Sequence, residues 1–302
     1  MRKPLILATL LLLTASAHAD VIKRGFDVAD GGTLRLDGGF GNIKVVTGGS
    51  GVAVEITRDA RGRNAQKRLA EHKITFEQRG NDVVITSDFE GRNNIHWFGW
   101  DDSDYDVQFN IRVPDRYNVE VETSGGNIEI DEIAGTVDAH TSGGNIRTGR
   151  LGGKSTLKTS GGDINVDGAS AELLAHTSGG SIEIGRVTGE VVARTSGGDI
   201  KIEDAAGRVD ASTSGGTIHA QISRQPAGDS RLTTSGGGVV VTLAPSIAVD
   251  LDAHASGGGV SSDVPITVQG RQDDDSLVGK INGGGPKLVL RSSGGGVRVR
   301  KG

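Results

Sequence analysis

A serine followed by paired glycines is the feature of this sequence closest to a catalytic motif, because strained turns of this kind present the nucleophile in some hydrolases. The first copy, TSGGNIEI at residues 123–130, is followed by six further TSGG copies. A serine nucleophile needs a neighbouring base and an oxyanion hole. Here equivalent serines stand at positions 124, 142, 160, 178, 196, 214 and 235, and none has distinctive neighbours. The repetition favours a structural role over a catalytic one.

Histidines are the next candidates, as ligands of a metal ion. His140, His176 and His254 each precede a copy of the motif. If every repeat forms one coil of a stack, His140 and His176 lie two coils, or about 10 Å, apart. Each ligand of a zinc ion lies about 2 Å from the metal, so these two side chains cannot share one. We therefore predict surface histidines, no metal site and no cofactor.

Carboxylates suggest two further kinds of site, for calcium and for glycan cleavage. Calcium-binding β-rolls repeat every nine residues and have aspartates in each turn, whereas here only Asp163 and Asp199 directly follow a glycine pair. Enzymes that cleave polysaccharides need two carboxylates at a defined separation. The acidic candidates show no obvious pairing; they are Asp131, Asp163, Asp199, Glu203 and Asp204. A carbohydrate-active β-helix enzyme, either a polysaccharide lyase or a hydrolase, is kept as the alternative to a non-enzymatic protein.

The most distinctive segment is HWFGWDDSDYD at residues 96–106, which contains both tryptophans of a chain that is 3% aromatic. Exposed aromatic side chains beside carboxylates are typical of sugar stacking or of protein interfaces. The candidate binding residues are Trp97, Phe98, Trp100, Asp101, Asp102, Asp104 and Tyr105. The competing interpretation is that the tryptophans cover the open end of a repeat array, because terminal repeats need a cap.

The spacing of the repeats predicts the fold. The motif threonines lie at 123, 141, 159, 177, 195 and 213, a constant interval of 18 residues, and such a period is typical of solenoids. After each glycine pair, aliphatic and polar residues alternate, as in a strand with one buried face. A second alternating segment, such as VDAH at 137–140, precedes the next threonine. Two strands per repeat predict an all-β parallel β-solenoid, or β-helix, with 18-residue coils.

In such a coil each TSGG motif is a structural corner. Alternation places the threonine inside, and the serine begins the turn that the glycines complete. Glycine suits a corner that needs positive φ or a close approach between coils, and a following Asn or Asp can bond to the corner backbone. The predicted corner glycines are Gly125, Gly126, Gly143, Gly144, Gly161, Gly162, Gly179, Gly180, Gly197, Gly198, Gly215 and Gly216.

The rest of the chain is less regular. Residues 20–120 predict an N-terminal β-rich section that caps the solenoid, with one short helix at 64–72 and a hairpin at 73–87. Residues 121–302 form the solenoid, from which a loop of about residues 263–286 is expected to leave and return. Thr148 and Ser155 occupy positions where other copies have aliphatic residues, so we expect that coil to be locally weak.

Residues 1–19 have the pattern of a secretory signal peptide, with basic residues at 2 and 3, an apolar run at 5–13, and predicted cleavage after Ala19. The apolar run is too short to span a bilayer, and we expect no membrane span elsewhere. The chain has no cysteine, which excludes disulfides and thiolate metal sites. Its net charge of -5 argues against a nucleic-acid partner. The predicted location is the periplasm, with secretion or surface display as alternatives.

The whole layout resembles the bacterial adhesin-like family of β-strand-repeat domains, which has no established function. The shared features are the export pattern, a strand ending in Val113-Pro114, the TSGGNI-type repeats and the closing NGGGPKLVLRSSGGGVRV. The resemblance implies a β-solenoid outside the cytoplasm and supplies no catalytic residues. We therefore predict a non-enzymatic, adhesin-like binding or scaffolding module of the bacterial cell envelope. Its partner is an envelope protein or a glycan, and the sequence does not indicate an oligomeric state.

Overall fold

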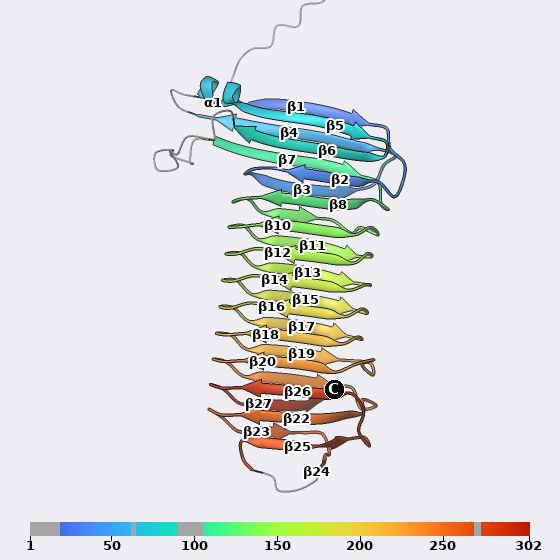
Figure 1. The fold of residues 1–302 in the computed structure, drawn as a ribbon, viewed down its shortest axis with the longest axis vertical. Coiled ribbons are helices and arrows are strands. Elements are labelled where there is room, and N and C mark those ends of the chain that lie inside the picture. Colours follow the sequence, from blue (N-terminus) through green and yellow to red (C-terminus); the bar gives the residue numbers. More distant parts are fainter. Residues whose placement is uncertain (1–18, 62–64, 90–104, 269–272) are drawn as a thin grey trace, which may run out of the picture.

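The computed structural model describes residues 19–61, 65–89, 105–268 and 273–302. In these residues the chain forms a long stack of strands with one short helix near the N-terminal end (Figure 1). The strands belong to two sheets, which we call sheet A, with 13 strands, and sheet B, with 14. Along most of the stack each coil contributes one strand to each sheet, and a single hydrophobic core lies between them. The predicted all-β solenoid is confirmed.

The regular coils are parallel and in register. Ile128, Ile146 and Ile164 are successive partners in sheet A, each one repeat further along the chain. The regular strands of sheet A are β9 (Ile128–Ile130), β11 (Ile146–Leu151), β13 (Ile164–Ala169), β15 (Ile182–Val187), β17 (Ile200–Ala205), β19 (Ile218–Ile222) and β21 (Val239–Leu243). Those of sheet B are β8 (Asn118–Thr123), β10 (Val137–Thr141), β12 (Ser155–Lys158), β14 (Leu173–His176), β16 (Val191–Arg194), β18 (Val209–Thr213) and β20 (Ser230–Thr234).

The core contains polar side chains as well as aliphatic ones. Thr148 and Ser155 are 0% and 1% exposed, although the equivalent positions of neighbouring coils are mostly aliphatic. The Ser155 hydroxyl donates a hydrogen bond to the carbonyl of Gly153 at 2.9 Å. The Thr148 hydroxyl has no hydrogen-bond partner among the described residues. Because an unpaired buried hydroxyl costs free energy, Thr148 is the weak point of its coil.

The N-terminal coils do not follow the order of the sequence. Sheet A begins β1-β4-β7-β3-β9, and sheet B ends β8-β2-β6-β5. The coil of β2 and β3 therefore lies between the coil of β6 and β7 and the coil of β8 and β9, although the chain passes directly from β7 to β8. The elements are β1 (Ala19–Phe26), β2 (Thr33–Asp37), β3 (Asn42–Thr47), β4 (Val52–Ala60), α1 (Ala65–Glu71), β5 (His72–Arg79), β6 (Asp82–Phe89) and β7 (Tyr105–Val113). The predicted helix and hairpin correspond to α1 and to the antiparallel pair β5 and β6.

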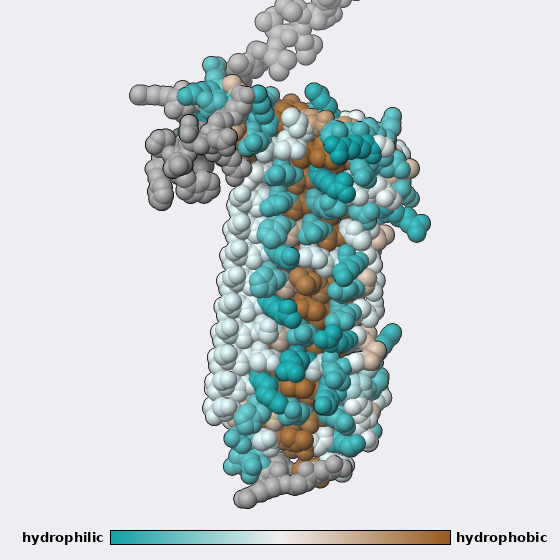
Figure 2. All heavy atoms as spheres, viewed as in Figure 1, coloured by the Kyte–Doolittle hydropathy of each residue, from teal (hydrophilic) through white to brown (hydrophobic). Residues whose placement is uncertain are grey.

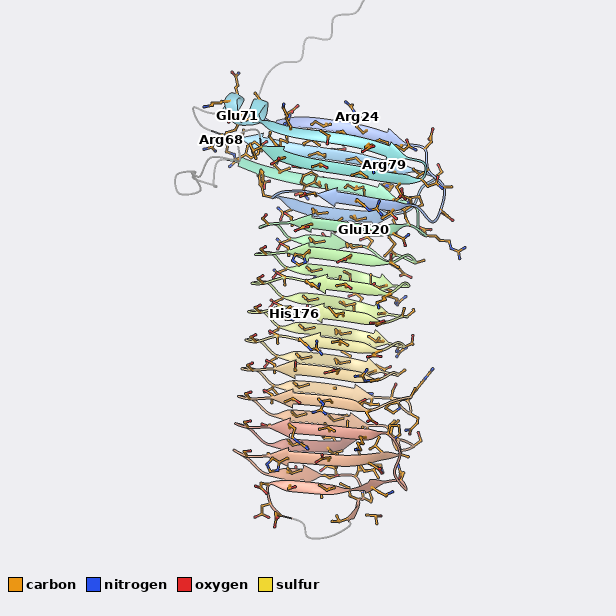
Figure 3. All side chains as sticks on the ribbon, in the orientation of Figure 1. Arg24, Arg68, Glu71, Arg79, Glu120 and His176 are labelled. Atoms are coloured by element: carbon orange, nitrogen blue, oxygen red, sulfur yellow. The ribbon has the colours of Figure 1, made fainter. Side chains whose placement is uncertain are left out.

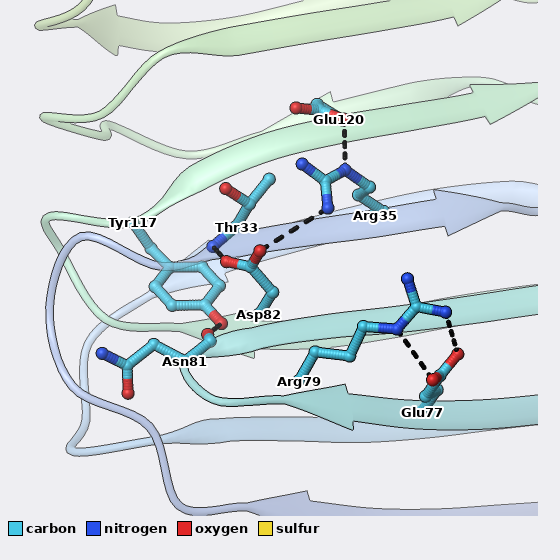
Figure 4. A network of polar contacts seen from close by, with 8 residues as sticks. All are labelled: Thr33, Arg35, Glu77, Arg79, Asn81, Asp82, Tyr117 and Glu120. Atoms are coloured by element: carbon cyan, nitrogen blue, oxygen red, sulfur yellow. Dashed lines mark hydrogen bonds and ion pairs between the residues drawn. The ribbon is translucent and has the colours of Figure 1, made fainter.

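Polar contacts join the inserted coil to both of its neighbours (Figure 4). Arg35 of β2 donates to the carboxylate of Glu120 in β8 at 2.8 Å and lies 3.6 Å from that of Asp82 in β6. Asp82 also accepts the backbone N–H of Thr33 at 2.9 Å. Tyr117, which is 0% exposed, donates its hydroxyl to the carbonyl of Asn81. These contacts link residues far apart in the sequence at the point where the chain order changes.

The C-terminal coils are also out of sequence order. The coil of β26 (Lys287–Ser292) and β27 (Val297–Lys301) lies between that of β20 and β21 and that of β22 (Val249–Ala255) and β23 (Val260–Ser262). The predicted loop at 263–286 needs a correction, because it contains β24 (Thr267–Val268) and β25 (Ser276–Ile281). β25 pairs antiparallel with β22 over six residues, so part of this segment extends sheet B. Its hydrogen bonds cover the edge that β22 would otherwise expose.

Candidate functional site

Most of the candidate binding segment lies outside the described residues. This is the case for Trp97, Phe98, Trp100, Asp101, Asp102 and Asp104. Tyr105, the seventh candidate, is the first residue of β7 and is described. The site can therefore be built from the elements that flank the segment, which are the end of β6 and the start of β7.

Four ring side chains hold the two flanks together, and we call them the aromatic clamp: Phe40, His72, Phe89 and Tyr105. Phe89 ends β6 and Tyr105 begins β7, and their ring centroids are 5.6 Å apart. The His72 ring stacks on Phe89 at 4.7 Å, and Phe40 contacts Phe89 at 5.3 Å. Such pairs contribute about 0.5–1.5 kcal/mol beyond their burial. The clamp thus fixes the spacing between the residues on either side of the candidate segment.

His72 is the buried polar member of the clamp, with 3% of its surface exposed. Its Nδ1 lies 2.7 Å from the Tyr105 hydroxyl and its Nε2 lies 2.7 Å from the Ser87 hydroxyl. Burial, together with the positive charge of Arg58, lowers the pKa of His72 to about 4. Burial raises the pKa of Tyr105 to about 12. Both groups are therefore neutral at pH 7, and Ser87, itself 3% exposed, serves the histidine and is closed to a substrate.

Arg58 of β4 ties the helix and the first strand to the clamp. Its Nη1 donates to the carbonyl of Leu69 in the last turn of α1 at 3.1 Å and to that of His72, directly after the helix, at 2.8 Å. Its Nη2 forms an ion pair with Asp20 of β1, and the Arg58 side chain is 11% exposed. A cation at a helix C-terminus satisfies carbonyls that lack partners within the helix.

The described part of the N-terminal cap is made by residues that the sequence analysis did not single out. The ring centroids of Phe26 in β1 and Phe76 in β5 are 6.3 Å apart, and the Arg24 guanidinium lies 5.8 Å from the centre of the Phe76 ring. Ile22 and Ile74 pack against the same core. In the sequence, the alternation of apolar residues in these two edge strands could have indicated that they cover the end of the core. A capping role of the tryptophans concerns residues outside the described ranges and stays a prediction.

At the corners, the second glycine of each pair closely approaches the preceding coil. A Cβ added to Gly144 would lie 2.0 Å from the carbonyl oxygen of Gly126, and one added to Gly162 would lie 2.0 Å from that of Gly144. The first glycine has more room, since a Cβ on Gly161 would be 3.4 Å from its nearest neighbour. Positive φ occurs at other described glycines, such as Gly283, but at none of the predicted corner glycines. Close approach of backbones therefore explains these glycines.

The corners from Thr141 to Thr234 repeat the same pair of threonine hydrogen bonds. Thr141 Oγ1 donates to the carbonyl of Gly126 at 2.8 Å and accepts the N–H of Gly144 at 3.4 Å. The side chain of Asn145 accepts the N–H of Asp163 in the next coil at 2.7 Å. Because the contacts are equivalent from coil to coil, no motif serine is set apart by a base and an oxyanion hole of its own.

The five acidic candidates do not come together as one site. Asp163 and Asp199 lie at corners, where each accepts a backbone N–H of the next coil at 2.7 Å. Asp204 forms an ion pair with an arginine of the preceding coil at 2.8 Å. Asp131 and Glu203 both line a shallow groove of about 730 Å³ on the outer face of sheet A. Within the described residues, no group of three His, Asp or Glu side chains is placed to hold a metal ion.

Exposed side chains on the outer face of sheet A form ion pairs between neighbouring coils. Glu183 and Lys201 are paired at 2.7 Å, as their spacing predicts. Glu129 pairs with Lys44 of the inserted N-terminal coil at 3.2 Å, a contact that the repeat spacing alone could not indicate. Exposed pairs of this kind contribute about 0.2–1 kcal/mol each.

Fold and repeats together define the class: a parallel β-solenoid whose coils stack through a repeated Thr-Ser-Gly-Gly corner. A family model described as Toastrack DUF4097 matches residues 42–300. The chain belongs to this Toastrack DUF4097 family. Among curated proteins no match is found. In the part of the chain that the structure describes, no helix is long and apolar enough to cross a membrane.

Solved structures with a similar arrangement have low sequence identity. A "putative adhesin" from Bacteroides fragilis is 12% identical, with 93% of this chain and 97% of that chain covered and a TM-score of 0.40. A "putative lipid binding protein" from Parabacteroides distasonis is 14% identical, with coverages of 92% and 96% and a TM-score of 0.38. A "putative cell adhesion protein" from Clostridium sporogenes is 12% identical, with coverages of 94% and 100% and a TM-score of 0.24.

Proposed function

We propose that this protein is an exported, non-enzymatic binding or scaffolding module of the bacterial cell envelope, similar to an adhesin. The observation that carries the proposal is the aromatic clamp. Phe89 and Tyr105 bracket the tryptophan-rich segment, and their rings are held 5.6 Å apart near the N-terminal end of the rod. A binding segment whose two flanks are fixed loses less conformational entropy when a partner binds.

The proposed chemistry is recognition by Trp97, Phe98, Trp100 and Tyr105, with the nearby carboxylates selecting polar groups on the partner. Aromatic side chains are frequent anchors at interfaces and stack on sugar rings. The partner is an envelope protein or a glycan. We place the protein in the periplasm after cleavage behind Ala19, with release or surface display as the alternatives. The equivalence of the corners supports a non-enzymatic role, because catalysis needs one distinguished set of side chains.

The test is a crosslinking pull-down from native envelope fractions with wild-type protein and with a Trp97→Ala, Trp100→Ala double variant. We expect the double variant to lose the captured partner while its melting temperature stays within about 2 °C of wild type, because the proposal gives the tryptophans a role in binding and none in stability. A control double variant, Lys67→Ala with Lys73→Ala, changes exposed residues near the same end and should retain the partner. If the tryptophan variant is destabilised and still captures every partner, the segment is a cap and the proposal is wrong.

A further inference from the structure

A column of side chains on the outer face of sheet B contains no carboxylate over eight consecutive coils. The backbone register sets its members, which in spatial order are His140, Lys158, His176, Arg194, Ser212, Thr233, Arg291 and His254. We call this set the basic column. Neighbouring strands are about 4.8 Å apart, so the column is about 34 Å long. Such a run is unexpected in a chain with a net charge of -5.

The two cations at the centre of the basic column, Lys158 and Arg194, are available to a partner. Lys158 and His176 have no ion pair among the described residues, and His176 projects from β14 near the corner side of the sheet (Figure 3). Arg194 lies 3.5 Å from the carboxylate of Asp210, with its side chain 51% exposed. Lower in the column, Arg291 is held more firmly, at 2.6 Å from a carboxylate of Asp252. The members of the column at its centre, which we call the central rungs, therefore carry the positive charges that neighbouring carboxylates neutralise least.

The two sides of these central rungs differ in chemistry. On the corner side, each rung is followed after one buried threonine by an exposed motif serine: Ser160, Ser178 and Ser196. On the other side, the neighbouring column has Thr156, Leu174 and Val192 beside these rungs, with Asp138 and Asp210 at its two ends. Figure 2 shows this face, with a pale column of small residues along one edge and a narrow hydrophobic stripe between hydrophilic columns. Over the three central coils, motif serines, basic side chains and apolar side chains thus lie side by side.

We propose that the basic column binds a linear acidic polysaccharide that lies along the axis of the rod. Carboxylates of uronic acid units would accept hydrogen bonds from the cations at Lys158 and Arg194. Sugar hydroxyls would bond to the motif serines, and the C–H faces of the sugar rings would pack on Leu174 and Val192. A regular ladder of side chains suits a ligand that is itself a regular polymer, because each added unit binds at an increased effective concentration.

The narrowness of the column favours a linear glycan over a membrane or a nucleic-acid duplex. One column further out lie carboxylates that are already paired, Glu172 with Lys154 at 2.8 Å and Glu190 with Arg208. A flat anionic membrane or a wide duplex would meet those carboxylates together with the basic column, whereas a single extended chain can follow the column alone. The inference rests on the proposed binding function for its setting in the envelope, but it uses a different surface.

The test compares two double variants with the same change in charge. Lys158→Gln with Arg194→Gln removes the central cations of the basic column. Lys154→Gln with Arg208→Gln, the matched control, removes two cations from the outer column on the same face. Polygalacturonate and alginate are the probes, and affinity is measured by biolayer interferometry. We expect wild-type protein to bind, the column variant to bind about tenfold more weakly, and the control to change less than about twofold.

Further arms identify the class of ligand. Binding should weaken as salt rises, and it should strengthen with the length of oligogalacturonate until the oligomer spans the column. Neutral dextran, double-stranded DNA and anionic phosphatidylglycerol vesicles should bind at least about tenfold more weakly than polygalacturonate. The Trp97→Ala, Trp100→Ala variant should keep uronate binding, so that the two proposals can fail separately. No binding of either polyuronate, equal losses in both double variants, or equal binding of DNA or vesicles would overturn the inference.

Discussion

Among single residues, the buried threonines of this core differ in whether their hydroxyl group has a hydrogen-bond partner. The motif threonines are buried but paired: Thr177 Oγ1 donates to the carbonyl of Gly162 at 2.8 Å and accepts the N–H of Gly180 at 3.3 Å. Thr148 is equally buried, and its hydroxyl has no partner among the described residues. A hydrogen bond is worth about 1 kcal/mol net, whereas an unpaired buried hydroxyl costs about 1–3 kcal/mol. The same side chain therefore stabilises one position and destabilises another.

This difference predicts opposite effects of one substitution. Thr148→Val should raise the free energy of unfolding by about 1–2 kcal/mol, because it replaces an unpaired hydroxyl with a methyl group of the same size. Thr177→Val should lower it by about 1–3 kcal/mol, because it leaves the Gly162 carbonyl and the Gly180 N–H without their partner. Urea denaturation measures both. Equal signs for the two variants would contradict the assignment.

At the scale of elements, the N-terminal section depends on a neutral histidine. His72 begins β5 and contacts the end of β6 and the start of β7. Its side chain forms one hydrogen bond through each of its two ring nitrogens. The positive charge of Arg58 faces it and opposes protonation, while the more weakly acting Asp88 favours it. A protonated ring would leave one of its two hydroxyl contacts with the wrong polarity unless that hydroxyl rotates. Protonation should therefore loosen the clamp.

The pH dependence of stability follows from the lowered pKa of His72. Above pH 6.5 the ring is neutral in both the folded and the unfolded chain. Between pH 6.5 and about 4 the unfolded chain binds a proton that the folded chain does not, so stability falls as the pH falls. The loss attributable to this residue is up to about 3 kcal/mol. Chemical denaturation at pH 7.5 and pH 4.5, followed by far-UV circular dichroism, measures it.

The matched control separates His72 from other titrating groups. His72→Gln should have lower stability at pH 7.5 but a smaller loss between the two pH values than wild type. His219→Gln, which changes an exposed histidine on sheet A, should keep the wild-type loss. An unchanged pH dependence in His72→Gln would mean that His72 is not the group responsible.

At the scale of the whole molecule, segments close to both ends of the chain are enclosed within the stack. The coil of β2 and β3 lies between two coils formed later in the sequence, and the final coil of β26 and β27 lies between two coils formed earlier. In a solenoid each coil is stabilised by its neighbours. β2 and β3, like the final strands β26 and β27, thus have partners on both sides. The edges of the stack are formed by antiparallel or very short strands, β1 among them, which resist edge-to-edge association.

Removal of the last coil should therefore affect more than the C-terminus. A chain that ends at residue 286 loses the partners of both β21 and β22, and we expect the amides of β22, β23 and β25 to lose hydrogen-exchange protection while β9 to β15 keep theirs. The control is deletion of one internal repeat, residues 159–176, which rejoins equivalent positions and should leave both ends protected. Full protection of β22 in the truncated chain would contradict the enclosed arrangement.

The structure of a single coil follows from local sequence. The interval of 18 residues, the alternation after each corner and the buried threonines follow from local rules of strand geometry, and the stacking of identical coils adds no new choice. The insertion of the second and last coils, the aromatic clamp and the far end of the basic column, from Thr233 to His254, depend on the tertiary structure. Each joins residues such as Phe40 and Tyr105, or Thr233 and Arg291, whose separation matches no repeat interval. The repeat period and the alternation of the sequence describe only neighbours one coil apart. The order in which the irregular coils pair depends on which exposed sheet edges each of them can cover.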